Sequence, residues 1–161
     1  MKKLNIALVA HDARKQELID WIAYNTDFLK NHNLYATGTT AKLISKIQYV
    51  VREYYIEGFV DSNRDLQVIP LLSGPLGGDQ QIGAMIAEGK IDVLIFFCDN
   101  LITQGHQQDV GALSRLASLY NIAFATNRTT ADMIITSPLC TDNTYDRIIP
   151  TVINNYKNRQ L

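Results

Sequence analysis

Hydrophobic residues along this chain of 161 residues form two kinds of pattern. Some lie in short uninterrupted runs, such as "NIALVA" at residues 5–10, which are typical of strands covered on both faces. Others recur at helical spacing with polar residues between them, which is typical of amphipathic helices. The runs predict strands at residues 5–10, 34–37, 68–72, 91–97 and 122–126. The helical spacings predict helices at 13–30, from about 41, at 80–88 and at 109–119, with a further short element at 130–135.

Strands and helices alternate along the chain, and this order is typical of a parallel sheet with helices on both faces. The length suits one domain that covers residues 1–161. The predicted fold is therefore a single α/β domain with three layers, in the manner of Rossmann-like proteins. Residues 49–67 fit this pattern poorly, since they hold three of the eight tyrosines. We expect them to extend a helix and then to form a surface excursion.

Composition excludes several classes of function. The net charge of −1 gives no attraction for nucleic acid or an anionic membrane, and no apolar run approaches the ~20 residues that span a bilayer. The two cysteines, Cys98 and Cys140, are too few for a disulfide framework or a zinc cage. Cys98 lies in the apolar run "VLIFFC" and is expected to pack as a buried thiol. We expect a cytoplasmic protein.

Polar residues follow each predicted strand at the point where the strand ends. The carboxyl ends of parallel strands meet at one edge of the sheet, where ligands bind in open α/β folds. These polar groups are therefore expected to share one edge. In chain order they are His11 and Asp12; Thr37, Gly38, Thr39 and Thr40; Ser73 and Gly74; Asp79; Asp99, His106 and Asp109; and Thr126 and Asn127.

The segment "ATGTT" at residues 36–40 supplies hydroxyl groups, a glycine for a tight turn and the unpaired N–H groups of a helix start. These are the components of a phosphate site. Lys15, one turn into the first helix, and Ser73 with Gly74 can complete it. The alternative is that a threonine of this segment serves only as an N-cap.

The stretch "SGPLGGDQQ" at residues 73–81 holds three glycines and a proline, and we expect these to exclude a helix before Asp79. Each acidic or histidine side chain on the predicted edge has an ordinary explanation as a cap, a turn residue or a surface residue, and His32 is expected on the surface. As a group beside a phosphate site, they form the set that acid–base chemistry on a small phosphorylated compound requires. The candidate acid–base residues are Asp79, Asp99, Asp109, His11 and His106.

Other kinds of site are weakly supported. His106 and Asp109 can offer two metal ligands, but the chain has no HExxH or Cys/His pattern, and no metal is expected. Walker A and GxGxxG motifs are absent, which argues against nucleotide binding. A Gly-x-Ser-x-Gly motif is also absent, which argues against the usual hydrolases.

The segments "IALVAHD", "LYATGTT", "LLSGPLGGDQQIGAMIAEGKIDVLIFFCD", "HQQDV" and "FATNRTTADMII", in this order and spacing, resemble the methylglyoxal synthase family. The resemblance runs from about residue 6 to residue 138 and excludes most of 46–67, and the block from GGDQQ to FF is highly specific. It implies a five-stranded parallel α/β domain assembled as a homohexamer. It also implies conversion of dihydroxyacetone phosphate to methylglyoxal and inorganic phosphate, with no metal or organic cofactor.

Matched position by position, the resemblance assigns roles to residues of this chain. The family's catalytic base falls on Asp79, the histidine and aspartate after its fourth strand on His106 and Asp109, its other aspartate on Asp99, and the histidine after its first strand on His11. The phosphate-binding positions fall on Lys15, Thr37, Thr39, Thr40, Ser73 and Gly74, with Gly38 in the same threonine loop. An arginine that reaches a neighbouring subunit's phosphate is matched by Arg159. Inorganic phosphate is then product and possible inhibitor.

Two departures and two alternatives accompany this interpretation. The family often reads His-Asp-Pro-Asp-Val where this chain has "HQQDV" at residues 106–110, and residues 46–67 are longer than the family norm. One alternative is a regulatory module that senses a phosphorylated or nucleotide effector, although such modules need not keep the carboxylates found here and this chain ends soon after the domain. The other is an isomerase or lyase acting on another small sugar phosphate.

Overall fold

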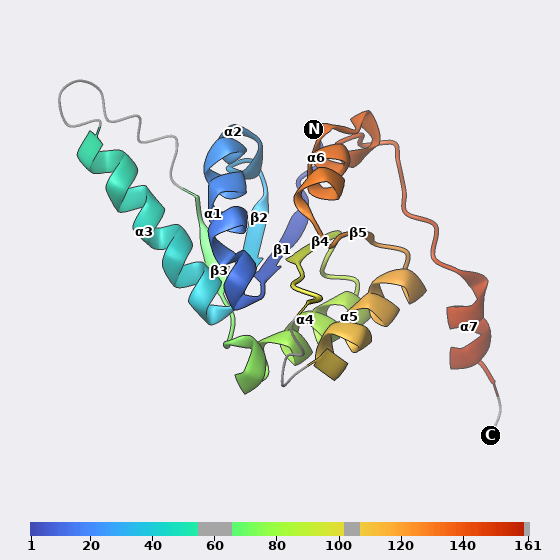
Figure 1. Cartoon of the computed structure of the whole chain (residues 1–161). Helices are drawn as coiled ribbons and strands as arrows, with labels where there is room; N and C mark the ends of the chain where they lie inside the picture. The colour runs from blue at the N-terminus through green and yellow to red at the C-terminus, as the bar shows by residue number, and fades with distance from the viewer. Residues whose placement is uncertain (55–65, 102–106, 160–161) are drawn as a thin grey trace.

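A computed structural model describes residues 1–54, 66–101 and 107–159 of the chain. Its centre is a five-stranded parallel sheet in the order β3-β2-β1-β4-β5 (Figure 1). The strands are β1 (Asn5–Ala10), β2 (Asn33–Ala36), β3 (Val68–Pro70), β4 (Val93–Phe97) and β5 (Ala123–Ala125). The predicted five strands and their parallel arrangement are confirmed. The central strand β1 pairs with β2 on one side and β4 on the other, so that Leu8 lies opposite both Ala36 and Ile95.

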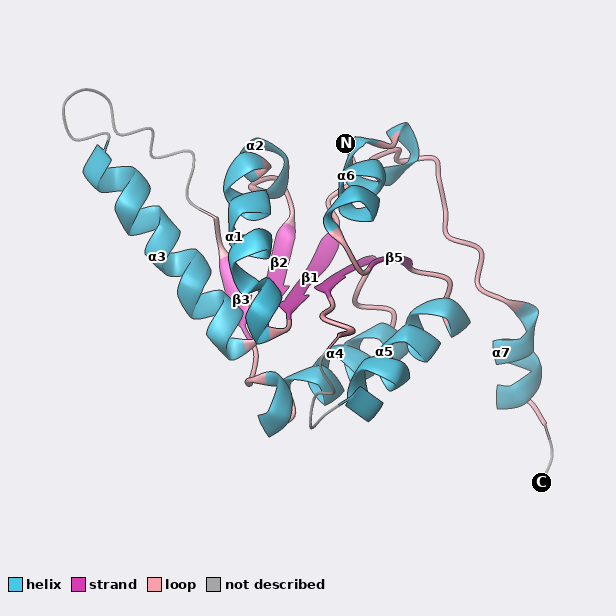
Figure 2. Cartoon of the chain, viewed as in Figure 1, coloured by secondary structure: helices cyan, strands magenta, loops and turns pink. Residues whose placement is uncertain are grey.

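Helices cover both faces of the sheet, as predicted (Figure 2). The longer helices are α1 (Lys15–Tyr24), α3 (Gly38–Tyr54), α4 (Gly78–Ala87), α5 (Gln107–Leu119) and α6 (Arg128–Thr136), and the shorter ones are α2 (Thr26–Leu29) and α7 (Thr151–Lys157). The described residues also form three short 3₁₀ helices, η1 (Asp12–Arg14), η3 (Gly74–Leu76) and η4 (Pro138–Cys140). Within the described residues, no helix is both long and apolar enough to cross a membrane.

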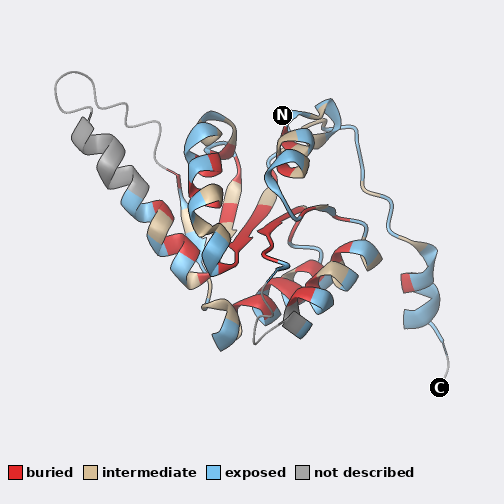
Figure 3. Cartoon of the chain, viewed as in Figure 1, coloured by how far each residue is buried: buried red, intermediate tan, exposed pale blue. Residues whose placement is uncertain are grey.

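The uninterrupted apolar run of β1 is explained by burial on both sides. Ile6 and Leu8 belong to the core under α1, α3 and α6, whereas Ala7 and Val9 belong to the core under α4 and α5. Each of these four side chains is at most 3% exposed. Figure 3 accordingly shows buried residues along the central strands. Because each fully buried Leu or Ile contributes roughly 1.5–3 kcal/mol, the two cores fix the sheet between the helix layers.

Two helical predictions need correction. The predicted helix at 13–30 is divided into η1, α1 and α2. The break between α1 and α2 is at Asn25, which leaves the helical conformation and whose side-chain Nδ2 donates to the carbonyl of Trp21 at 2.9 Å. The glycine-rich stretch was expected to exclude a helix before Asp79, yet it forms η3 with Pro75 near the start of that turn. Proline fits there because the first N–H groups of a helix need no intrahelical partner. We assigned no element after residue 135, where η4 and α7 occur.

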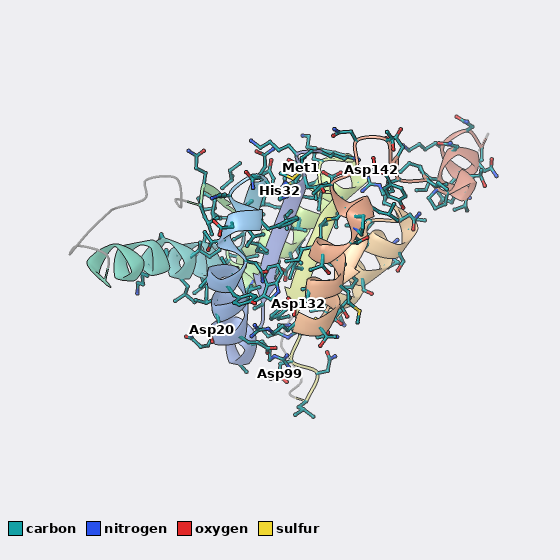
Figure 4. All side chains as sticks on the ribbon, turned by 90° about the horizontal axis from the view of Figure 1, so that it is seen from above. Met1, Asp20, His32, Asp99, Asp132 and Asp142 are labelled. Carbon is teal, nitrogen blue, oxygen red and sulfur yellow. The ribbon has the colours of Figure 1, made fainter. Side chains whose placement is uncertain are left out.

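The prediction that His32 lies on the surface is wrong. His32 is 4% exposed, its ring centroid lies 4.4 Å from that of Phe28, and its Nδ1 accepts a hydrogen bond from the Leu4 amide at 3.2 Å. Burial, reinforced by the positive charge of Lys3, lowers the pKa of His32. Figure 4 shows His32 at the opposite end of the molecule from Asp99, so this histidine is part of the fold and not of the predicted edge.

Candidate active site

A cavity of about 210 Å³ lies where β1, β2, β3 and β4 end, at the edge predicted from the sequence. Each strand supplies it with residues at or just beyond its carboxyl end. Because the strands are parallel, residues far apart in the chain meet here. The predicted site residues that line the cavity are His11, Lys15, Thr37, Thr39, Ser73, Gly74 and Asp79.

His11 follows β1 directly, and a hydrogen bond fixes the orientation and tautomer of its neutral ring. It is 3% exposed, and its Nδ1 accepts a hydrogen bond from the backbone N–H of Asp99 at 2.8 Å. The ring also meets Phe96 edge-on, with 5.0 Å between the ring centroids. Because Nδ1 accepts a hydrogen bond from an amide, the proton of the neutral ring is on Nε2. His11 is therefore oriented as an Nε2–H donor.

Asp79 stands in the first turn of α4, with its side chain against Gly74. It is 3% exposed, although it lines the cavity. A Cβ atom added at Gly74 would lie 3.1 Å from Oδ2 and 3.2 Å from Oδ1 of Asp79. Only the absence of a side chain at Gly74 allows this approach without a shift. The turn between β3 and α4 thus positions a buried carboxylate at the cavity, where water has little access.

The other side of the cavity carries groups suited to an anion. Thr37 and Thr39 flank the first residue of the 17-residue helix α3, whose N-terminal N–H groups and dipole favour negative charge. The hydroxyl of Thr37 lies 3.3 Å from that of Thr40, which is buried behind it. Lys15 adds a positive charge on a side chain that is 17% exposed and forms an ion pair with Asp12. One small cavity therefore combines a carboxylate with a site for an anion.

Comparison with known proteins gives a consistent answer. A family model described as the MGS-like domain matches residues 17–126. Methylglyoxal synthase of Leptospira interrogans serogroup Icterohaemorrhagiae serovar copenhageni is 49% identical over 144 residues, which cover 89% of this chain and 86% of the relative. Methylglyoxal synthase of Maridesulfovibrio salexigens is 54% identical over 140 residues, which cover 85% of each protein. The chain belongs to the methylglyoxal synthase family.

A solved structure supports the same family at the level of the fold. The crystal structure of methylglyoxal synthase from Elizabethkingia anophelis NUHP1 superposes with a TM-score of 0.81 and 39% sequence identity, and the match covers 99% of this chain and 93% of that chain. Membership of the methylglyoxal synthase family makes the protein an enzyme, a lyase that forms methylglyoxal. The alternative of a regulatory module is not favoured, because these matches cover most of each protein and the relatives are named as enzymes.

Four of the predicted site residues are described by the structure but do not line the cavity. Asp99 is 9% exposed and takes part through its backbone N–H to His11, while its Oδ1 accepts from the Leu101 amide at 3.0 Å. Thr40 and Gly38 lie behind the lining, in the start of α3. Arg159 follows α7, and its guanidinium carbon lies 4.3 Å above the ring of Tyr156. Figure 1 shows α7 apart from the sheet.

Two predicted residues cannot be placed. His106 lies outside the described residues. Asp109 lies in α5, and its side chain is likewise outside what the structure describes. Neither the described part of the chain nor the cavity contains a group of three histidine, cysteine or acidic residues arranged to hold a metal ion.

Five lining residues were not among the predicted site residues: Val9, Ala10, Asp12, Pro75 and Phe96. Asp12 follows His11 directly after the end of β1. The position of this polar pair was therefore the signal that could have identified Asp12. Phe96 carried no such signal, because it is one of five consecutive buried residues of β4. Its role is visible only from its contact with the ring of His11.

Cys98 is confirmed as a buried thiol near this edge of the sheet. It is 7% exposed, and its Sγ donates to the carbonyl of Phe96 at 3.3 Å. Burial raises the pKa of Cys98 to about 11, and nearby Arg14 opposes only part of that rise. The thiolate is the nucleophilic form of cysteine, so a raised pKa and burial are typical of a packing residue.

Proposed function

We propose that the protein converts dihydroxyacetone phosphate to methylglyoxal and inorganic phosphate through an ene-diolate, with Asp79 as the general base. The observation that carries this proposal is the position of Asp79: a carboxylate that is 3% exposed lines the same cavity as Thr37, Ser73 and Lys15. A base beside an anion site is what proton abstraction from a small phosphorylated ketone requires.

In the first step, Asp79 takes a proton from C3, the hydroxymethyl carbon next to the ketone. The carbonyl oxygen gains negative charge as the C2–C3 double bond forms, and hydrogen-bond donors near that oxygen lower the barrier. We assign this role to neutral His106, which we propose is held by a hydrogen bond to Asp109 or another carboxylate and later moves a hydroxyl proton. His11 presents its Nε2–H, and the Asp99 amide holds the ring through Nδ1.

In the second step, the bond between C1 and the bridging oxygen breaks and its electrons leave with the phosphate. The resulting enol aldehyde has its double bond between C1 and C2. It takes up a proton at C1, which becomes the methyl carbon, and its C2 hydroxyl loses one, which gives methylglyoxal. The bond can break only if it lies perpendicular to the plane of the ene-diolate, so the groups that hold the phosphate decide the product. Lys15, Ser73 and the threonine loop at residues 37–40 fix this angle and stabilise the leaving phosphate.

The experiment follows methylglyoxal and inorganic phosphate together after dihydroxyacetone phosphate is added to the purified protein. We expect equal amounts of both products, and we expect Asp79→Asn to lower turnover by about 10²–10⁴-fold because one positioned base is lost. Asp20→Asn is the matched control, since Asp20 is an exposed carboxylate on α1 that accepts from Gln16. Near-normal turnover of Asp79→Asn would remove that residue from the role of base.

We further propose that the chain acts as a cytoplasmic homohexamer, in which Arg159 reaches the phosphate site of a neighbouring subunit. Exposed apolar side chains on the C-terminal segment support a contact with another copy: Ile148 is 76% exposed, Val152 55% and Tyr156 65%. Inorganic phosphate, as a product held in the same site, is expected to inhibit. Light scattering of the full chain measures the subunit number, and Arg159→Gln should weaken substrate binding without changing that number.

A further inference from the structure

The peptide units of Leu72 connect the two halves of the cavity. The carbonyl oxygen of Leu72 accepts a hydrogen bond from the backbone N–H of Gly38 at 3.1 Å. The same oxygen packs against Gly78, where an added Cβ would lie only 2.0 Å from it. The backbone N–H of Leu72 donates to the side-chain Oε1 of Gln81 at 2.8 Å. One residue therefore contacts the start of α3, the end of the glycine-rich turn and the first turns of α4.

Two of these three contacts, those to Gly38 and Gly78, lie next to a residue of the site. Gly38 stands between Thr37 and Thr39, which line the anion side of the cavity. Ser73 follows Leu72 directly, and Asp79 follows Gly78. The position of Leu72 therefore sets the distance between the hydroxyl groups of the anion site and the carboxylate.

The side chain of Gln81 accepts a hydrogen bond from the first backbone N–H beyond the end of the sheet. The last backbone bond between this segment and β2 is the one from Leu71 N–H to the carbonyl of Ala36, at 2.8 Å. The next N–H, that of Leu72, has turned toward α4 and finds the amide oxygen of Gln81. Gln81 itself is exposed and is not among the residues that line the cavity. Any effect it has on the reaction must therefore pass through Leu72.

We propose that Gln81 is a positioning residue for catalysis: its side chain fixes the Leu72 backbone to α4, so that the anion site and Asp79 keep a constant separation. The inference rests on the proposed function, because it assigns the carboxylate and the anion site to one substrate. A hydrogen bond that served only stability would affect unfolding and leave the rate of turnover unchanged.

Three variants of the full chain test the proposal. Gln81→Met keeps the length of the side chain and removes the acceptor. Gln81→Glu keeps an oxygen at the acceptor position. Gln16→Met is the matched control, since it removes an exposed side-chain hydrogen bond that Gln16 makes to Asp20 within α1. For each, kcat and KM are measured with dihydroxyacetone phosphate, the inhibition constant with inorganic phosphate, and the melting temperature by calorimetry.

We expect Gln81→Met to lower kcat by about 10- to 100-fold, because misplacement of reacting groups by about 1 Å can cost 10²-fold. The inhibition constant of phosphate should change by less than about threefold, because Lys15 and the threonine loop remain in place. Gln81→Glu should retain kcat within about threefold of the parent, since a carboxylate oxygen can accept from the same N–H. Gln16→Met should match the parent.

The contrary outcomes separate the inference from the function on which it rests. If the parent protein makes no methylglyoxal from dihydroxyacetone phosphate, the proposed function fails and the inference fails with it. If the parent is active and Gln81→Met keeps its kcat, the inference alone is refuted. It is equally refuted if Gln81→Met and Gln81→Glu lose kcat, phosphate inhibition and melting temperature together, because that pattern belongs to a residue needed only for folding.

Discussion

Replacement of Gly74 by alanine tests the position of Asp79 with the smallest possible change. The added methyl group would lie 3.1 Å from Oδ2 and 3.2 Å from Oδ1 of the carboxylate, where ordinary contacts are 3.4–4 Å. Gly74 is not among the residues with positive φ, so alanine can adopt its backbone conformation. The three protein atoms nearest the added methyl group all belong to Asp79, so the effect on the protein itself acts through that carboxylate.

The expected loss of activity follows from the size of the displacement. The carboxylate must move by a few tenths of an ångström. If a displacement of 1 Å costs about 10²-fold, one of a few tenths costs roughly 5- to 10-fold in kcat. The loss of stability is small. Overpacking lowers the free energy of unfolding by about 1–3 kcal/mol, and the lower entropy of the unfolded alanine chain offsets about 0.4–1 kcal/mol of this. For a protein of this size the melting temperature should fall by at most about 10 °C.

The assay measures kcat with dihydroxyacetone phosphate by the release of phosphate, well below the melting temperature of the variant. Gly111→Ala is the matched control, because Gly111 is exposed in α5 and an added Cβ meets nothing within 4 Å. As a replacement of glycine inside a helix, it should stabilise the protein by about 0.5–1 kcal/mol and leave kcat unchanged.

Two results would refute the reasoning about Gly74. One is a kcat of Gly74→Ala within about twofold of the parent, which would mean that the carboxylate beside the methyl group takes no part in the slow step. The other is an equal loss of kcat in Gly111→Ala, which would mean that the measured rate reports general stability. A fall in kcat much greater than 100-fold, without loss of stability, would point to direct contact of the methyl group with substrate.

Three further predictions concern stability and reactivity. Gly78→Ala should destabilise the protein by at least about 3 kcal/mol in urea unfolding, because its methyl group would lie 2.0 Å from a backbone carbonyl oxygen; an unchanged midpoint would contradict this contact. His32 has a lowered pKa, so the unfolded chain binds more protons than the folded one and the free energy of unfolding should fall as the pH drops below about 6.5. His32→Asn keeps an acceptor for the backbone amide, and it should reduce this slope; an identical slope would exclude His32 as its source. With a pKa of about 11, Cys98 should resist Ellman's reagent at pH 8 in the native protein and react rapidly in urea; rapid native labelling would contradict its burial.

The sheet was predictable from the sequence because burial on both faces leaves an unmistakable pattern. Residues 5–10 form β1 with the predicted bounds, and the other strands begin or end within two residues of the prediction. Helix boundaries were harder, since they depend on single side chains: Asn25 ends α1 through a bond to its own helix, which periodicity does not reveal. His32 was misplaced because a buried histidine and an exposed one look alike in sequence. Its burial depends on the packing of Phe28 and on the amide of Leu4, which precedes β1.

Polar residues of the site were predictable for a different reason. In a parallel sheet every strand ends at the same edge, so His11, Thr37 and Ser73 could be brought together from their positions alone. Apolar residues of the lining, and residues that lie behind it, could not be predicted in this way. Phe96 belongs equally well to a core, and nothing in the order of residues shows that the backbone N–H of Asp99 donates to His11.

The glycine-rich turn between β3 and α4 illustrates why an exposed, polar residue can escape notice. Gly74 and Gly78 are both needed for close approach, one to the carboxylate and one to the carbonyl of Leu72. Two glycines give the backbone many alternative conformations, so some other group must select one of them. The hydrogen bond from Leu72 to Gln81 supplies that selection from outside the cavity. The conformational freedom that lets Asp79 approach Gly74 is thus the reason that we expect a glutamine two residues further along α4 to be required.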